Sequence, residues 1–162
     1  MTVSITTPAG PLTTAVCESA RRSVLCWLAT ADAQGQPNVS PKEVWAIADD
    51  QHVVVANIAS PVSVRNIAQQ PLVCLSFVDV LVQKGFKLTG TARELLPTHA
   101  DYAAWAAPLL AMAGERIPVR SVLLIEVQGV QPIVAPSYWL YPEVTTEASQ
   151  IKAARRAYGL GG

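Results

Sequence analysis

Short polar turns between β-like apolar runs are the feature that most restricts the fold of this chain. Six runs have strand character, and they cover residues 23–32, 38–48, 52–57, 72–80, 83–95 and 120–136. Parallel strands need crossover connections of about a dozen residues or more, whereas antiparallel strands are joined by tight turns. Most turns here are short, so the pattern predicts a mostly antiparallel sheet that closes into a small barrel.

Helical patterns occupy the segments outside these runs. They cover residues 12–22, about 61–70, 98–114 and the tail "TTEASQIKAARRAYGLGG". The helix at 61–70 is the one helix that joins two strands directly, between "HVVVAN" and "LVCLSFVDV". No repeat, low-complexity segment or linker interrupts the chain, and 162 residues are enough to bury one core. We therefore expect a single domain over residues 1–162.

The low charge content predicts that the chain associates with itself. Only 15% of the residues are charged, against about a quarter in typical domains, while 51% are hydrophobic. Dimerisation would cover the apolar surface that a monomer of this size leaves exposed. Twelve Lys and Arg residues balance twelve Asp and Glu residues, so no net field favours nucleic acid or an anionic membrane.

The cysteines and histidines predict neither a disulfide framework nor a metal site. Cys17, Cys26 and Cys74 have no zinc spacing, and the chain contains only two histidines, His52 and His99. An odd number of unpatterned cysteines, without a signal peptide, favours a cytoplasmic location. No apolar run approaches the length of a membrane span, about 18 residues.

The start of the helix at 61–70 has the composition of an anion site. Ser60 suits the N-cap and Pro61 the first helical position, and no acidic residue follows in the first turn. The free amides and the dipole at this end favour an anion, which the hydroxyls of Ser60 and Ser63 and the cation of Arg65 would also bind. Serine caps and early arginines also occur in helices that bind nothing, so both interpretations stand at this point.

Four segments, taken together, resemble the pyridoxamine 5′-phosphate oxidase-like, FMN-binding split-barrel family. They are "GQPNVSPKEVW" (35–45), "VVVANIASPVSVRNIAQQPLVCLSF" (53–77), "QKGFKLTGTAREL" (83–95) and the tail "PSYWLYPEVTTEASQIKAARRAYGL". Their order and spacing follow the family. The resemblance implies an α+β fold, a six-stranded antiparallel split β-barrel with peripheral helices. It also implies a homodimer with FMN sites at the subunit interface.

The resemblance further implies which residues contact FMN. Ser60, Ser63, Arg65 and Asn66 match the positions that hold the phosphate. Ser40, Pro41 and Lys42 match the segment that faces the isoalloxazine ring, where a lysine near N1 and C2=O favours the reduced anionic flavin. Asn57 matches a position near the ribityl chain, and Gln83 and Lys84 match the start of the strand that reaches the cofactor.

The functional hypothesis is an FMN-dependent oxidoreductase whose flavin accepts hydride from NAD(P)H or a small organic donor. No catalytic acid or base is indicated. Pyridoxamine 5′-phosphate oxidases also carry an Arg-x-His element near the C-terminus, which this chain lacks, so oxidation of vitamin B6 is not expected. A non-catalytic flavin-binding or flavin-sequestering protein is the main alternative, and a split barrel that binds haem or a deazaflavin is another.

Overall fold

A seven-stranded antiparallel sheet forms the body of the protein. The structure is a computed structural model that describes residues 10–160. Every strand pairing in it is antiparallel, and the order across the sheet is β2-β1-β5-β6-β7-β4-β3. The strands are β1 (Cys26–Ala31), β2 (Pro37–Lys42), β3 (Trp45–Ile47), β4 (His52–Asn57), β5 (Leu72–Asp79), β6 (Lys84–Leu95) and β7 (Ser121–Val134). The predicted α+β split barrel is confirmed.

The strand count differs from the prediction by one, because the run at 38–48 is two strands. Lys42 ends β2 on one edge of the sheet, and Trp45 begins β3 on the other edge. The two residues between them carry the chain from edge to edge, and the backbone N–H of Ala56 donates to the carbonyl of Val44 at 2.9 Å. This crossing curls the sheet, so that β2 approaches the end of β4.

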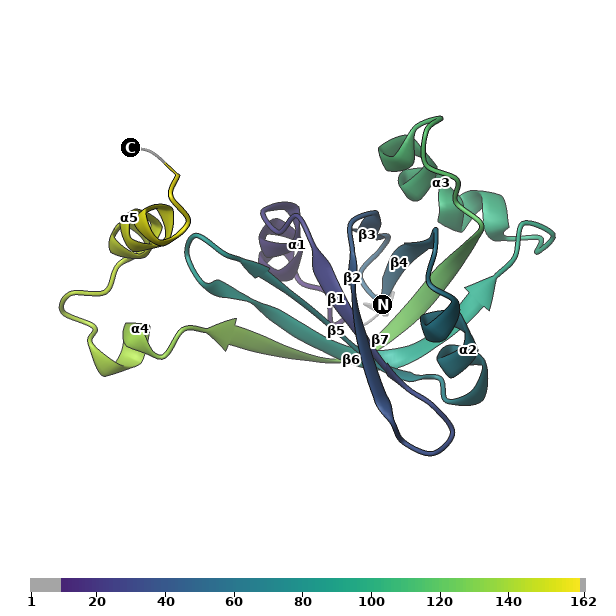
Figure 1. Cartoon of the computed structure of the whole chain (residues 1–162), viewed down its shortest axis with the longest axis horizontal. Helices are drawn as coiled ribbons and strands as arrows, with labels where there is room; N and C mark the ends of the chain where they lie inside the picture. The colour runs from purple at the N-terminus through teal and green to yellow at the C-terminus, as the bar shows by residue number, and fades with distance from the viewer. Residues whose placement is uncertain (1–9, 161–162) are drawn as a thin grey trace, which may run out of the picture.

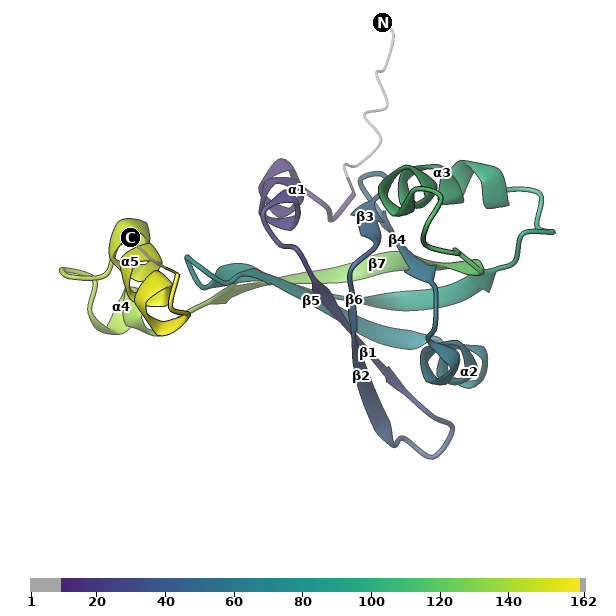
Figure 2. The same cartoon turned by 45° about the horizontal axis from the view of Figure 1, so that its top comes forward.

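Within residues 10–160, five helices accompany the sheet (Figure 1): α1 (Thr14–Arg21), α2 (Pro61–Gln69), α3 (Tyr102–Ala113), α4 (Ser137–Leu140) and α5 (Glu147–Ala157). In Figure 2, α1 and α3 are at the top of the view and α2 is lower, below the end of β6, although α1 and α2 contribute to the same core. None of the helices in residues 10–160 has both the length and the apolar character needed to cross a bilayer.

The apolar side chains form two cores, one on each face of the curled sheet. Inside the curl, Val16 of α1 packs among residues of several strands, including Trp45 and Phe77, whose ring centroids lie 5.2 Å apart. On the other face, Ala106 and Leu109 of α3 cover β4 and β7. Successive side chains of a strand point alternately to the two cores, which explains why β4 is buried at every residue after His52.

The last part of the chain forms an arm that leaves the sheet. Beyond β7, α4 and α5 stand apart from the other helices at the left of Figure 1. The hydroxyl of Tyr138 donates to the carbonyl of Val82 at 2.8 Å, and the Lys84 ammonium lies 4.2 Å from the Tyr138 ring centroid. Tyr141 (63% exposed) and Val144 (72% exposed) remain open to solvent on the arm. We call residues 135–160 the C-terminal arm.

The backbones of β6 and β7 approach each other too closely at Gly90 to leave room for a side chain. The register of these strands shifts between Thr89 and Gly90, and a Cβ on Gly90 would lie 2.0 Å from the carbonyl oxygen of Glu126. Gly90→Ala should therefore lower the free energy of unfolding by about 2 kcal/mol or more, measured by urea denaturation. Gly35→Ala is the control, because Gly35 has a φ of +82° but no atom within 4 Å of its Cβ position. It should lose only about 1 kcal/mol, and equal losses in the two variants would contradict the close approach.

Candidate functional site

The site lies where the end of β2 meets the start of α2. The ammonium of Lys42 donates to the hydroxyl of Ser60 at 2.5 Å, and the hydroxyls of Ser40 and Ser63 lie 3.2 Å apart. One turn further along α2, the side-chain amide of Asn66 donates to the hydroxyl of Thr30 on β1 at 3.0 Å. Three polar contacts thus attach α2 to β1 and β2, and they gather most of the predicted phosphate-holding residues.

Lys42 is a buried cation without an acidic partner among residues 10–160. Its side chain is buried, with only 5% of the residue exposed, and no ion pair of the described residues includes it. Burial lowers the pKa of Lys42 below its ordinary value, while the nearby Cys26 opposes that shift. The ammonium has three donors and Ser60 takes one of them, so the remaining donors are suited to an anion.

The first turn of α2 supplies a second preference for an anion. Ser60 is the N-cap and Pro61 the first helical residue, as predicted, and the first turn contains no acidic residue. The Ser60 hydroxyl makes no capping bond within the helix, and it accepts a hydrogen bond from Lys42. The backbone N–H groups at the N-terminus of α2 therefore have no side-chain cap from Ser60. They carry the positive end of the helix dipole and lie beside the buried ammonium of Lys42.

A polar network that the sequence analysis missed supports the loop before α2. The side-chain amide of Asn57 donates to the Ser121 hydroxyl at 2.8 Å and to the Glu94 carboxylate at 3.4 Å, and the Ser121 hydroxyl donates to the same carboxylate. The Asn57 side-chain oxygen accepts from the backbone N–H of Ser60 at 3.3 Å. Ser121 and Glu94 occur at strand ends in unremarkable sequence contexts, so only the strand register reveals them.

Two predicted residues lie at the margin of this cluster. Arg65 is exposed on α2, on the turn that follows Pro61. Pro41 is exposed on β2 and lies opposite Trp27 of β1, on the face of the sheet turned away from Lys42. Neither has a polar contact with Lys42 or Ser60 in the described structure.

Gln83 and Lys84 lie elsewhere in the chain. Gln83 lies in the turn between β5 and β6 and Lys84 begins β6, and in Figure 1 this turn is at the opposite end of the view from α2. The Lys84 ammonium donates to Glu147 of the C-terminal arm at 2.9 Å, and Gln83 has a positive φ of 56°. The structure therefore does not bring these two residues to the Lys42–Ser60 cluster within one chain.

The arrangement is built for binding and positioning. Burial raises the pKa of the Cys26 thiol, which faces Lys42 across β1 and β2, to about 12, so this thiol stays protonated at neutral pH. The remaining groups at the cluster are hydroxyls, amides and one ammonium. Such a set of donors is suited to holding an anion.

The family of the chain follows from its sequence and this geometry together. The sequence model of the pyridoxamine 5′-phosphate oxidase family matches residues 12–133. The chain therefore belongs to this family, and the matched residues span the sheet together with α1, α2 and α3. None of the curated proteins matches the chain by sequence.

Solved structures of the same fold include proteins with different ligands in their names. HupZ from group A Streptococcus is 27% identical, with a TM-score of 0.63, and the match covers 73% of this chain and 90% of that one. An FMN-binding protein from Syntrophomonas wolfei is 14% identical, with a TM-score of 0.60, covering 75% and 88% of the two chains. The haem storage protein HutZ from Vibrio cholerae is 19% identical, with a TM-score of 0.60, covering 74% and 93%.

Lys42 should be a destabilising residue while the site is empty. Lys42→Met removes a buried charge that has only a neutral partner, so we expect the free energy of unfolding at pH 7 to rise by roughly 1 kcal/mol or more. A lysine whose folded pKa is lowered penalises folding while it is protonated. The advantage of the variant should therefore shrink as the pH rises toward the unfolded pKa, near 10.4.

Urea denaturation of both proteins between pH 7 and pH 10 measures this difference. Lys87→Met, at an exposed lysine of β6, is the matched control and should show no pH-dependent difference from the wild type. A Lys42→Met variant that is less stable than the wild type at pH 7, by an amount independent of pH, would contradict the assignment.

Proposed function

We propose that the chain is an FMN-binding protein whose cofactor phosphate lies at the start of α2, against Lys42 and Ser60. One observation carries the proposal: the buried ammonium of Lys42 adjoins the N-terminus of α2, and no carboxylate among residues 10–160 pairs with it. A phosphate dianion would supply the missing negative charge, and its oxygens would accept hydrogen bonds from the backbone N–H groups at the start of α2. The family of the chain includes FMN-binding proteins, which supports the same ligand.

Each predicted phosphate-holding residue has a role in this proposal that fits its position. Ser60 donates to the phosphate directly, and so does Lys42, which the family resemblance places at the isoalloxazine ring instead. Arg65 is a second cation, because side chains of a helix tilt toward its N-terminus and so toward this site. Ser63 and Asn66, which are buried, hold α2 against Ser40 and Thr30.

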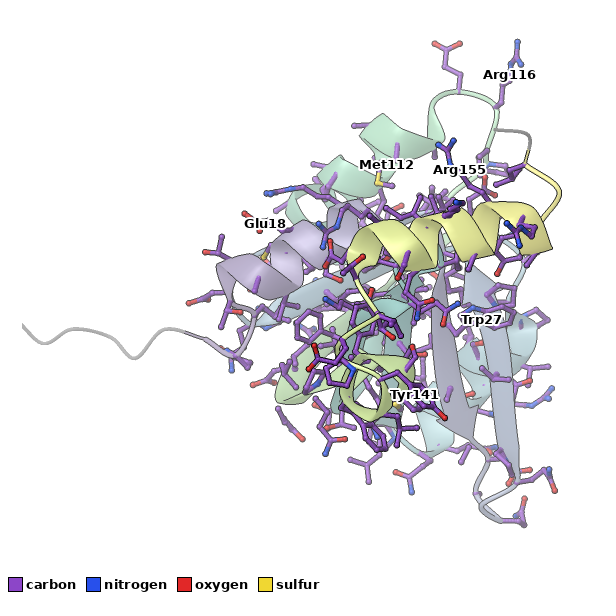
Figure 3. The ribbon with its side chains drawn as sticks, turned by 90° about the vertical axis from the view of Figure 1, so that its left-hand side faces the viewer. Glu18, Trp27, Met112, Arg116, Tyr141 and Arg155 are labelled. Atoms are coloured by element: carbon purple, nitrogen blue, oxygen red, sulfur yellow. The ribbon has the colours of Figure 1, made fainter. Side chains whose placement is uncertain are left out.

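The proposed assembly is a homodimer, and the exposed apolar side chains support it. On the outer face of β1 and β2, Trp27 lies opposite Pro41 and Ala29 opposite Val39. Trp27 is 46% exposed and Val39 is 59% exposed. Figure 3 labels Trp27 on the sheet and Tyr141 on the C-terminal arm, in a view from the end that carries the arm. A second copy would bury such surfaces, and its Gln83 and Lys84 would then be available to the cofactor.

For the chemistry, we propose an oxidoreductase in the cytoplasm. Bound FMN supplies two-electron chemistry, with NAD(P)H or a small organic molecule as the hydride donor. The chain's own residues bind the phosphate, fix the orientation of the cofactor and exclude water from Lys42. The proposed compartment rests on the odd, unpatterned set of cysteines in the sequence, Cys17, Cys26 and Cys74.

The positions of the histidines favour FMN over haem. His52 contacts the Asp49 carboxylate and packs against Trp105, with ring centroids 5.0 Å apart. His99 is exposed before α3 and lies near Asp101. Neither histidine has a contact with Lys42, Ser60 or the start of α2 in the described residues, so the site offers no imidazole as a ligand for haem iron.

The phosphate assignment predicts a difference between two flavins. Lys42→Met combined with Ser60→Ala should weaken FMN binding by about tenfold or more, because charge-assisted hydrogen bonds to the phosphate are lost. Riboflavin, which lacks the phosphate, should bind the variant and the wild type alike. Quenching of flavin fluorescence measures both affinities, and Lys87→Met is the control. Equal losses for the two flavins would contradict a phosphate site at this position.

The absorbance spectrum of the purified protein separates the proposed cofactor from its alternatives. We expect flavin bands near about 370 and 450 nm that bleach when NADH or NADPH is added without oxygen. A flavin spectrum without bleaching by any donor of a panel would indicate a flavin carrier instead of an enzyme. A Soret band would indicate haem, and a colourless protein that does not bind added FMN would refute the proposal.

A further inference from the structure

Three polar residues meet beneath the loop that leads into α2, and each comes from a different strand. Asn57 is the last residue of β4, Ser121 is the first residue of β7 and its register partner, and Glu94 lies near the end of β6. β7 runs between β4 and β6 in the sheet, so Ser121 lies between the other two. The register pairs Asn57 with Ser121 and places Glu94 opposite Leu123, two residues further along β7, so the three side chains lie close together.

The hydrogen bonds of this triad give the Asn57 amide a single orientation. Its nitrogen donates to the Ser121 hydroxyl at 2.8 Å and to the Glu94 carboxylate at 3.4 Å. Both of these partners accept, because the Ser121 hydroxyl uses its own hydrogen on Glu94. The amide oxygen must consequently point the other way, and there it accepts from the backbone N–H of Ser60.

We propose that Glu94 and Ser121 are positioning residues for the anion site and act through Asn57 to hold Ser60 beside Lys42. This inference rests on the proposed function. The chain of hydrogen bonds runs from the Glu94 carboxylate through Ser121 and Asn57 to the Ser60 backbone, and Ser60 in turn accepts from Lys42. If the amide of Asn57 turned over, its N–H₂ group would face the N–H of Ser60, and two donors would oppose each other.

The burial of Ser121 and Asn57 argues against direct contact of these two residues with a ligand. Ser121 is 1% exposed and Asn57 is 9% exposed, and the amide groups of Asn57 are already bonded to protein atoms. The sequence resemblance implies a place for Asn57 near the ribityl chain. The structure assigns it instead to the support of the phosphate end of the site.

Ser121→Ala tests the proposal, because it removes the group that orients Asn57. The variant should raise the dissociation constant of FMN about threefold to tenfold, the effect of one net hydrogen bond. Its affinity for riboflavin should stay within about twofold of the wild type, since only the phosphate end is disturbed. Ser23→Ala is the matched control, because Ser23 is also a buried serine, bonded to the Ser19 carbonyl at 3.0 Å away from α2. It should change neither affinity.

A pair of substitutions at Glu94 separates positioning from charge. Glu94→Leu removes the acceptor, whereas Glu94→Gln keeps a carbonyl oxygen in its place. Both variants remove a negative charge, which by itself should strengthen the binding of an anion. Weaker FMN binding in Glu94→Leu but not in Glu94→Gln would therefore indicate that positioning is lost. If Glu94→Leu and Ser121→Ala bind FMN as well as the wild type does, or lose FMN and riboflavin equally, the proposal is overturned.

Nuclear magnetic resonance of the cofactor-free protein keeps this test independent of the proposed function. The side-chain amide hydrogens of Asn57 should exchange with solvent about tenfold or more slowly in the wild type than in Glu94→Leu. Slow exchange in a wild type that fails to bind FMN would refute the proposed function and keep the triad as the support of Ser60. Fast exchange in the wild type would overturn the positioning role, whatever the protein binds.

Discussion

The buried ammonium of Lys42 is the constraint on which the site depends. Removing a charge from water is costly unless an opposite charge or several hydrogen bonds replace the lost solvation. Lys42 has one hydroxyl partner, Ser60, and faces a thiol that burial keeps neutral. A methionine would fill the same space without that cost, so folding alone does not explain a lysine here. The retained charge is explained if the site holds an anion, and the N-terminus of α2 favours the same occupant.

The curl of the sheet brings the Lys42 ammonium to the start of α2. Because the chain crosses from β2 to β3 within two residues, the end of an edge strand is brought against the loop after β4. α2 is then attached at three levels: Ser60 to Lys42, Ser63 to Ser40, and Asn66 to Thr30. Ile67 anchors the other side of the helix in the inner core. A site held by a strand end and a packed helix keeps its geometry better than a site made of loops alone.

The sequence predicted the features that depend on local pattern. The turn lengths led to an antiparallel barrel, and the serine–proline start of α2 was found from capping preferences. The division of 38–48 into two strands escaped prediction, because nothing in the run says that its halves pair with opposite edges of the sheet. The link between Lys42 and Ser60 and the triad under Asn57 also depend on register across strands. Gln83 and Lys84 match the family pattern in sequence, yet in space they contact the C-terminal arm.

The C-terminal arm lies beyond the residues that the family model matches. The family match ends at residue 133, and the arm follows it directly. The anion site lies wholly within the matched part, so binding of a phosphate group is a function that the shared fold can support. The arm carries exposed Tyr141 and Val144, and Glu147 on it binds Lys84 at the turn between β5 and β6. In the proposed homodimer that turn would reach the cofactor of a second copy, and the contact with Glu147 would then fix the position of the Lys84 ammonium there.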